Sequence, residues 1–233
     1  MKTNSFRKGL IDGIPICLGY LSVSFAFGIY AVEEWGLSVL HALLISVSCV
    51  TSAGQLAAVP IIAGGGGLWE LAVSQLVINL RYSLMSISLS QKLDKKIKLP
   101  SRLAIAFVNT DEVFAVASGQ AGIVGKRYMY GLILLPWAGW SVGTLLGAVA
   151  GNILPAIVTT SLGVAIYGMF IAIVVPEMKK SSPTALCVAL AVALSLAFYY
   201  VPFLRAIPTG FTVIICAVIA GGVMAWLKPI QEE

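Results

Sequence analysis

The chain has 233 residues, of which 59% are hydrophobic and 11% are charged, and its formal net charge is +5. Soluble domains carry about 25% charged residues, so the composition excludes an ordinary soluble domain. Repeated apolar runs of about 20 residues, the length of a membrane-spanning helix, predict an all-α polytopic membrane protein with one transmembrane domain over residues 1–233. The basic residues are scattered through short loops, which indicates contact with the lipid bilayer and not with nucleic acid.

Eight apolar segments can be placed along the chain, each bounded by polar or turn-forming residues. They cover residues 10–32, 38–62, 68–90, 103–123, 130–150, 155–176, 184–202 and 207–227. Segment 103–123 contains two adjacent acids, so we expect seven or eight helices that span the membrane or partly re-enter it. Pro15, Gly28 and Pro60 are predicted helix breaks or hinges, because proline lacks a backbone donor and glycine is flexible.

The lysine and arginine residues of the loops constrain the topology, because cytoplasmic loops carry an excess of both. If all eight segments span and the N-terminus is cytoplasmic, the basic residues divide eight inside to six outside. If segment 103–123 does not cross and the N-terminus is outside, they divide ten to four. If segment 38–62 or 68–90 is re-entrant as well and the N-terminus is cytoplasmic, they divide thirteen to one. The rule favours the last two arrangements.

Two weakly similar stretches suggest an internal duplication. GYLSVSFAFG at Gly19–Gly28 resembles GWSVGTLLG at Gly139–Gly147 in glycine spacing, and each is followed by a segment that ends in valine and proline. Duplicated halves are common in transporters, where the substrate site lies between the repeats. The two halves would cover residues 9–123 and 124–228.

Glycine also recurs at every fourth position of the fifth segment, at Gly139, Gly143, Gly147 and Gly151. This spacing removes side chains from one face of a helix and lets another backbone approach closely. The stripe therefore predicts tight helix packing and says nothing about chemistry.

Arg81 lies near the middle of segment 68–90, within QLVINLRYSLMS. A guanidinium stays charged at physiological pH, and placing one at the centre of a membrane helix costs at least about 2.5 kcal/mol. If the segment is one straight helix, Asn79 lies on a polar face and Tyr82 lies at its edge. Arg81 then points roughly to the opposite side. Because two faces are polar, we expect this helix to lie inside the helix bundle. Arg81 then either forms a salt bridge that fixes packing or faces a ligand. A break at Asn79 would change this geometry.

Asp111 and Glu112 are the acids that can pair with Arg81. They lie inside an apolar segment, in NTDEVFAV, and point about 100° apart on a helix, so at most one pairs cleanly. Burial favours the neutral form of a carboxyl group, which allows one of them to take and release a proton. The alternative is a segment at the membrane interface with hydrated acids.

The second segment gathers hydrogen-bonding side chains around Gly54 and Gln55, within SVSCVTSAGQ. Small residues and glycine fit a broken helix that lines a cavity, and they also fit polar contacts between packed helices. The four cysteines lie singly in apolar segments, which indicates packing. Common catalytic and nucleotide-binding motifs and clusters of metal ligands do not occur in the sequence, so we expect no catalytic residue, no enzyme activity, no metal and no cofactor.

Taken in order, these motifs resemble the AzlC family of branched-chain amino-acid permeases. The resemblance rests on GIPICLGYLSVSFAFG, SAGQ, NLRYSLMS and NTDEVFA and covers essentially the whole chain. The most specific part is NLR followed by TDE after an interval of about 30 residues. In that family the aromatic residue after NLR is often histidine, whereas this chain has Tyr82.

The resemblance implies a multi-pass secondary transporter in the cytoplasmic (inner) membrane of a prokaryote, which exports branched-chain amino acids and works with a small AzlD-type membrane subunit. The residues that would bind substrate are Arg81, Asn79, Gln55, Gly54 and Tyr82, and Asp111 or Glu112 would carry a coupling proton or form an ion pair. Two alternatives stay open. One is a non-transporting subunit that docks and stabilises a partner, and the other is a transporter of another amino acid, such as methionine, or of a small organic acid.

Overall fold

The computed structural model describes residues 4–151, 153, 157, 168, 171, 174–176, 178–179 and 181–228. Helices make up the regular structure of these residues, and no strand occurs among them. Within the same residues, four helices are long and apolar enough to cross a membrane: Phe6–Glu34, Lys126–Gly151, Ser182–Tyr200 and Gly210–Leu227. These helices confirm the predicted all-α membrane class. The predicted segment 155–176 lies mostly outside the described residues.

The chain divides into two compact units. Unit 1 contains Met1–Leu56 and Asn79–Gly163, and unit 2 contains Ala57–Ile78 and Val164–Glu233. Unit 1 therefore carries Arg81, both acids of the TDE motif and the polar residues around Gly54.

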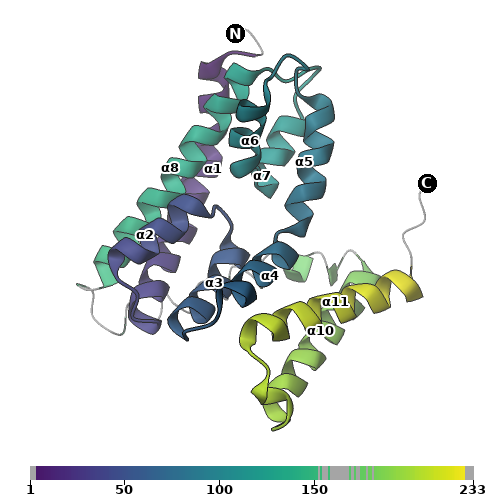
Figure 1. The fold of residues 1–233 in the computed structure, drawn as a ribbon. Coiled ribbons are helices and arrows are strands. Elements are labelled where there is room, and N and C mark those ends of the chain that lie inside the picture. Colours follow the sequence, from purple (N-terminus) through teal and green to yellow (C-terminus); the bar gives the residue numbers. More distant parts are fainter. Residues whose placement is uncertain are drawn as a thin grey trace. The chain divides into compact units, whose positions relative to one another are not determined.

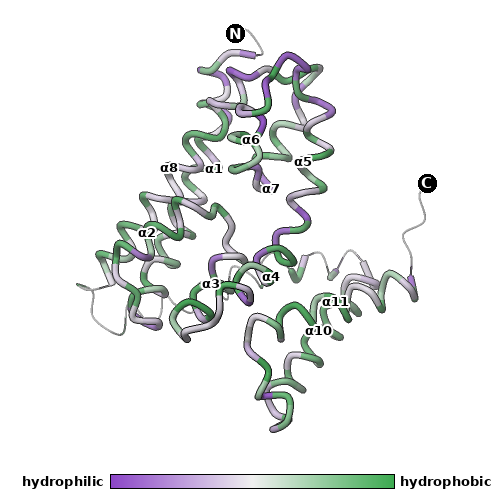
Figure 2. The backbone as a smooth tube through the Cα atoms, in the orientation of Figure 1, coloured by the Kyte–Doolittle hydropathy of each residue, from purple (hydrophilic) through white to green (hydrophobic). Residues whose placement is uncertain are grey.

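The backbone of unit 1 is a pair of long parallel helices, α1 (Phe6–Ile29) and α8 (Lys126–Gly151). They lie side by side and begin at the same end (Figure 1). A short π-helical turn, η1 (Tyr30–Glu34), extends α1. Figure 2 shows both helices as mainly hydrophobic, whereas hydrophilic stretches mark the start of α5 and of α7.

The predicted glycine stripe is the surface of α8 that contacts α1. A Cβ atom at Gly139 would meet Cys17, one at Gly143 would meet Leu21, and one at Gly147 would meet the carbonyl oxygen of Phe25. Gly151, the last of the four, lies beside Glu33 and Ile29. Because the two backbones touch here, a side chain has no room at Gly139, Gly143 and Gly147, as expected for a stripe of small residues at a helix contact.

Pro15, Gly28 and Pro60, the predicted helix breaks or hinges, do not interrupt their helices. Helix α1 runs without interruption through Pro15 and Gly28, and Gly28 packs against the backbone of α8 at Thr144. Helix α3 (Ser52–Ala63) runs through Pro60 in the same way. The prolines and glycine are therefore accommodated inside helices.

Three predicted segments are each divided into two short helices. Segment 38–62 becomes α2 (Val39–Ser48) and α3, and segment 68–90 becomes α4 (Leu68–Ile78) and α5 (Leu80–Lys92), separated at Asn79. Segment 103–123 becomes α6 (Leu99–Phe107) and α7 (Asp111–Ser118). At about 1.5 Å per residue, none of these helices reaches the roughly 30 Å thickness of the hydrocarbon core.

Helices α6 and α7 form a hairpin that enters unit 1 from one end and returns to it. The Lys92 side chain at the end of α5 donates to the carbonyl of Ser118 at the end of α7, and the backbone amide of Val124 donates to the carbonyl of Lys92. Asn4 donates to the carbonyl of Ile123, which brings the start of the chain to the same place. Segment 103–123 therefore does not cross.

Most basic residues of unit 1 gather at this end, which we call the basic end. They are Arg7, Lys8, Lys92, Lys95, Lys96, Lys98, Arg102, Lys126 and Arg127. The opposite end of α1 carries Glu33 and Glu34. The fold thus separates charge along the axis of the α1–α8 pair.

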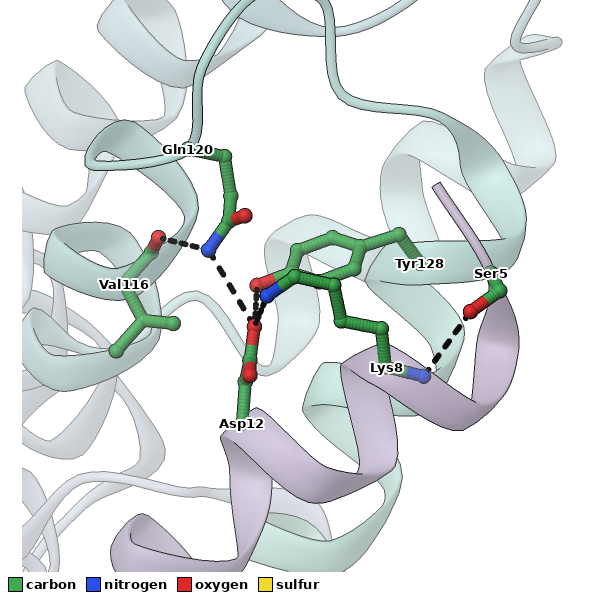
Figure 3. A network of polar contacts seen from close by, with 6 residues as sticks. All are labelled: Ser5, Lys8, Asp12, Val116, Gln120 and Tyr128. Atoms are coloured by element: carbon green, nitrogen blue, oxygen red, sulfur yellow. Dashed lines mark hydrogen bonds and ion pairs between the residues drawn. The ribbon is translucent and has the colours of Figure 1, made fainter. Parts of the chain in front are cut away.

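Near the basic end, Asp12 ties three elements together (Figure 3). Its Oδ2 atom lies 2.5 Å from Lys8 Nζ and accepts from Tyr128 Oη at 2.7 Å and Gln120 Nε2 at 3.3 Å. These donors come from α1, α8 and the chain after α7. A carboxylate with one cation and two further donors is well compensated at the edge of a membrane, so the network anchors the hairpin to the long helices.

Unit 2 contains α4, α10 (Ser182–Tyr200) and α11 (Thr209–Leu227), with a short 3-10 turn, η2 (Leu204–Ala206), before α11. Both long helices are hydrophobic over almost their whole length (Figure 2). Glu70 of α4 accepts a hydrogen bond of 3.0 Å from the backbone amide of Gly210, which satisfies an amide in the first turn of α11.

Candidate functional site

The three helix breaks meet in unit 1 around a pocket of about 190 Å³, which we call the central pocket. The break between α2 and α3 contributes Ser48, Cys49, Val50 and Thr51; the break before α5 contributes Asn79 together with Tyr82; and the α6–α7 break contributes Ala106, Phe107, Asn109 and Thr110. Non-helical backbone at membrane depth is tolerated only where it is buried in protein or lines a cavity. The pocket therefore explains how the three helix breaks are tolerated at membrane depth.

Two threonines begin the helices that leave the breaks. Thr51 Oγ1 accepts from the amide of Gly54 at 3.3 Å, and Thr110 Oγ1 accepts from the amide of Val113 at 3.5 Å. Threonine is a favoured N-cap residue because its side chain satisfies an amide that has no partner in the first turn. Gly54 is one of the residues that the resemblance implied for substrate binding, and its amide donates to this cap.

Gln55 holds the first break in place from behind the central pocket. The residue is fully buried. Its Nε2 donates to the carbonyl of Cys49 at 2.6 Å and to Ser46 Oγ at 3.0 Å, while its Oε1 accepts from Trp140 Nε1 at 3.2 Å. Neither Gln55 nor Gly54 is among the residues that line the pocket. The structure therefore places both in support of the break, away from the position that the sequence suggested.

Arg81 pairs with Asp111, one of its two predicted partners. Arg81 Nη2 lies 2.8 Å from Asp111 Oδ2 and donates to Tyr82 Oη at 3.0 Å. Tyr82 Oη in turn donates to Thr51 Oγ1 at 3.4 Å. A continuous polar chain thus runs from the acid of α7, through the guanidinium, to the wall of the central pocket.

The side chains of this ion pair are half exposed, 56% for Arg81 and 47% for Asp111. Arg81 lies eleven residues before the basic end of α5, or roughly 16 Å along the helix axis, which is about half of the hydrocarbon thickness. Charged groups at this depth face a protein interior or a water-filled cavity. The exposed surface of the pair is therefore a place that water and small solutes can reach.

Glu112 has a different environment from its neighbour Asp111. Its Oε2 atom accepts a hydrogen bond from Tyr20 Oη. Tyr20 is 8% exposed on α1, and its ring packs edge-to-face on Trp140 of α8 at a centroid distance of 5.1 Å. One acid thus has a cationic partner and the other has a neutral phenol, which agrees with the expectation that at most one pairs with Arg81.

The break at Asn79 corrects the geometry expected for a single straight helix. Asn79 and Tyr82 both line the central pocket, while Arg81 lies beside it on the start of α5. Ser86 and Ser90 remain on one face of α5, where they line a second cavity against α6.

Asn109 is a polar residue of the site that the sequence reasoning did not single out. It is 3% exposed, and its Nδ2 donates to Ser86 Oγ at 3.1 Å, while its Oδ1 has no hydrogen-bond partner. An asparagine directly before the capping Thr110, inside an apolar segment, was the available signal, because asparagine disfavours helix interiors.

Comparison with known proteins identifies relatives over most of the chain. A family model described as "AzlC protein" matches residues 15–154. An inner membrane protein of Escherichia coli strain K12, YgaZ, is 29% identical over 201 residues, which is 83% of this chain and 80% of that protein. An uncharacterized membrane protein of Archaeoglobus fulgidus is 34% identical over 196 residues, covering 83% and 85%.

A relative with a named activity is more distant. The branched-chain amino acid transport protein AzlC of Bacillus subtilis is 24% identical over 179 residues, which is 76% of this chain and 69% of that protein. No solved structure matches this chain. The central pocket and the Arg81–Asp111 pair lie within the residues that the family model covers.

Proposed function

The chain belongs to the AzlC family, and we propose that it is a secondary transporter that exports branched-chain amino acids across the cytoplasmic membrane of a prokaryote. The observation that carries this proposal is the meeting of three helix breaks around a small pocket, lined by both polar and apolar residues, beside an intramembrane ion pair. Transporters bind substrate near the bilayer midplane with such discontinuous helices.

Arg81 is the proposed anchor for the carboxylate of the substrate. Arginine binds carboxylates with two parallel hydrogen bonds, and half of the Arg81–Asp111 pair is open to solutes. An incoming carboxylate would take the place of Asp111 on the guanidinium, while Tyr82, Thr51 and Asn79 offer hydrogen-bonding groups from the pocket wall. The exchange keeps Arg81 paired in both states, so no bare cation is left in the membrane.

Glu112 is the proposed carrier of the coupling proton. Of the two acids, Asp111 is neutralised by Arg81, whereas the contact of Glu112 with Tyr20 is a hydrogen bond to an uncharged group. A proton on Glu112 would therefore leave the Arg81–Asp111 ion pair intact. Proton entry through Glu112 would then drive amino-acid export.

The N-terminus is proposed to be cytoplasmic. The basic end of unit 1 holds nine lysine and arginine residues in the described part of the chain, and loops rich in these residues stay in the cytoplasm. The α6–α7 hairpin enters from that same end, which supports the arrangement in which segment 103–123 does not cross and the N-terminus is inside.

A small AzlD-type membrane subunit is the proposed partner. Helix α10 packs against α11, and its exposed apolar residues, among them Leu186, Val192 and Leu196, form a surface for lipid or for another membrane protein. The resemblance of the chain to its family supports a small subunit as the partner.

Loss of labelled leucine and valine from preloaded cells tests the proposed function. Cells that express the protein together with the small subunit should lose both amino acids faster than cells that carry the empty vector, while loss of labelled glutamate should be equal in the two. The amount of protein in the membrane is measured in parallel. Equal loss of leucine and valine, with the protein present in the membrane, contradicts the proposal.

A further inference from the structure

A second cavity of about 250 Å³, which we call the apolar pocket, lies between α5 and α6. Its apolar lining consists of Ile87, Leu89, Leu93, Leu103, Ile105 and Ala106. Leu89 and Ile105 are almost fully buried and form its floor. Such a cavity suits an aliphatic group.

The apolar pocket and the central pocket adjoin each other. Ala106 and Asn109 line both of them, and the hydrogen bond from Asn109 to Ser86 lies where they meet. The buried Oδ1 of Asn109 has no hydrogen-bond partner. Buried polar groups in native proteins are almost always satisfied, so an unpaired acceptor at this position indicates a ligand with a donor group.

We infer that the apolar pocket receives the aliphatic side chain of the transported amino acid, while its charged groups occupy the central pocket. The substrate ammonium then donates to Asn109 Oδ1, and its carboxylate lies on the side of Arg81. This inference rests on the proposed function and adds to it the site that selects the side chain.

The size of the apolar pocket agrees with this occupant. A side chain of four carbon atoms fills roughly 120 Å³, if each carbon takes about the 30 Å³ that one water molecule occupies in the liquid. The pocket therefore holds a leucine or isoleucine side chain with room to move, as a transporter that must release its substrate requires.

The variant Ser90→Leu tests the inference by filling the apolar pocket without touching the central one. Ser90 lines the apolar pocket and not the central pocket, and the residue is exposed. Export of leucine should fall relative to export of valine by about tenfold, because a difference of one methylene in an apolar pocket changes discrimination by about 10–200-fold. The measurement is the ratio of initial export rates from cells preloaded with equal amounts of both.

Two control variants separate this effect from general damage. Ser88→Leu makes the same change at an exposed position of α5 outside both pockets, and Ser90→Ala removes only the hydroxyl group. Both should keep the leucine-to-valine ratio within about twofold of the wild-type ratio. A twofold change is small compared with the roughly tenfold or greater change expected for one methylene. If Ser90→Leu does not reach the membrane, Leu103→Ala is measured, and it should raise export of the larger methionine relative to valine.

An unchanged ratio in Ser90→Leu, or an equal change in Ser88→Leu, overturns the inference. Failure of the proposed function has a different signature, because then the wild-type protein itself exports neither amino acid.

Discussion

Arg81→Ala should abolish export of leucine and valine, and Arg81→Lys should retain only a small part of it. Two charge-assisted hydrogen bonds to a carboxylate are worth about 1.5–3 kcal/mol each, so their loss reduces transport at least about 100-fold. Lysine keeps the charge and loses the planar fork that binds both oxygens. The measurement is the initial rate of export from preloaded cells, normalised to the amount of protein in the membrane.

Arg205→Ala is the matched control for this prediction. Arg205 is also exposed and also lies close to a tyrosine ring, that of Tyr199, but it belongs to unit 2 and donates to a backbone carbonyl. Export should stay within about twofold of wild type, as is usual for a surface change. Wild-type activity in Arg81→Lys would show that the site needs a charge and not a guanidinium.

Glu112→Gln should remove the dependence of export on the proton gradient while leaving amino-acid exchange intact. Glutamine keeps the size and hydrogen-bonding capacity of the side chain and cannot take up a proton. In vesicles that contain the wild-type transporter, a lower pH outside the vesicles should accelerate leucine efflux. The same pH difference should have no effect on Glu112→Gln, although labelled leucine still exchanges with unlabelled leucine.

Asp111→Asn and Tyr20→Phe are the informative companions of this variant. Asp111→Asn removes the resting partner of Arg81, so substrate affinity should change while the response to the proton gradient remains. Tyr20→Phe removes the hydrogen bond to Glu112, so the response to the proton gradient should change while the Arg81–Asp111 pair remains. A Glu112→Gln protein that still responds fully to the gradient contradicts the assignment of the proton to this residue.

The sequence was sufficient for the features that depend on charge and on small side chains. An arginine in an apolar segment requires a partner, and the adjacent acids 30 residues later supplied one, which the Arg81–Asp111 distance confirms. Glycines at every fourth position likewise allow only close contact between backbones, and α8 meets α1 along that face.

The sequence left a break at Asn79 and a broken helix near Gly54 as open alternatives, because helix breaks depend on contacts between distant parts of the chain. Residues 49–51 are as apolar as their neighbours, and this break is stabilised by Gln55, which is itself held by Trp140 of α8. Prolines at positions 15 and 60 mark no break, since helices of membrane proteins tolerate a missing donor. Gln55 supports the break between α2 and α3, and Asn109 lies in the break between α6 and α7, so neither role could be assigned before the breaks were known.

Protection of Cys49 from alkylation tests most directly whether the meeting point of the helix breaks binds substrate. Cys49 is partly buried and lines the central pocket, and the other three cysteines can be replaced by alanine so that it is the single thiol. The rate at which a small membrane-permeant maleimide modifies Cys49 is measured in membranes. Leucine should slow the reaction in a saturable way, and glutamate should not. An equal rate with and without leucine, in a protein that still exports leucine, would contradict the placement of the substrate in the central pocket.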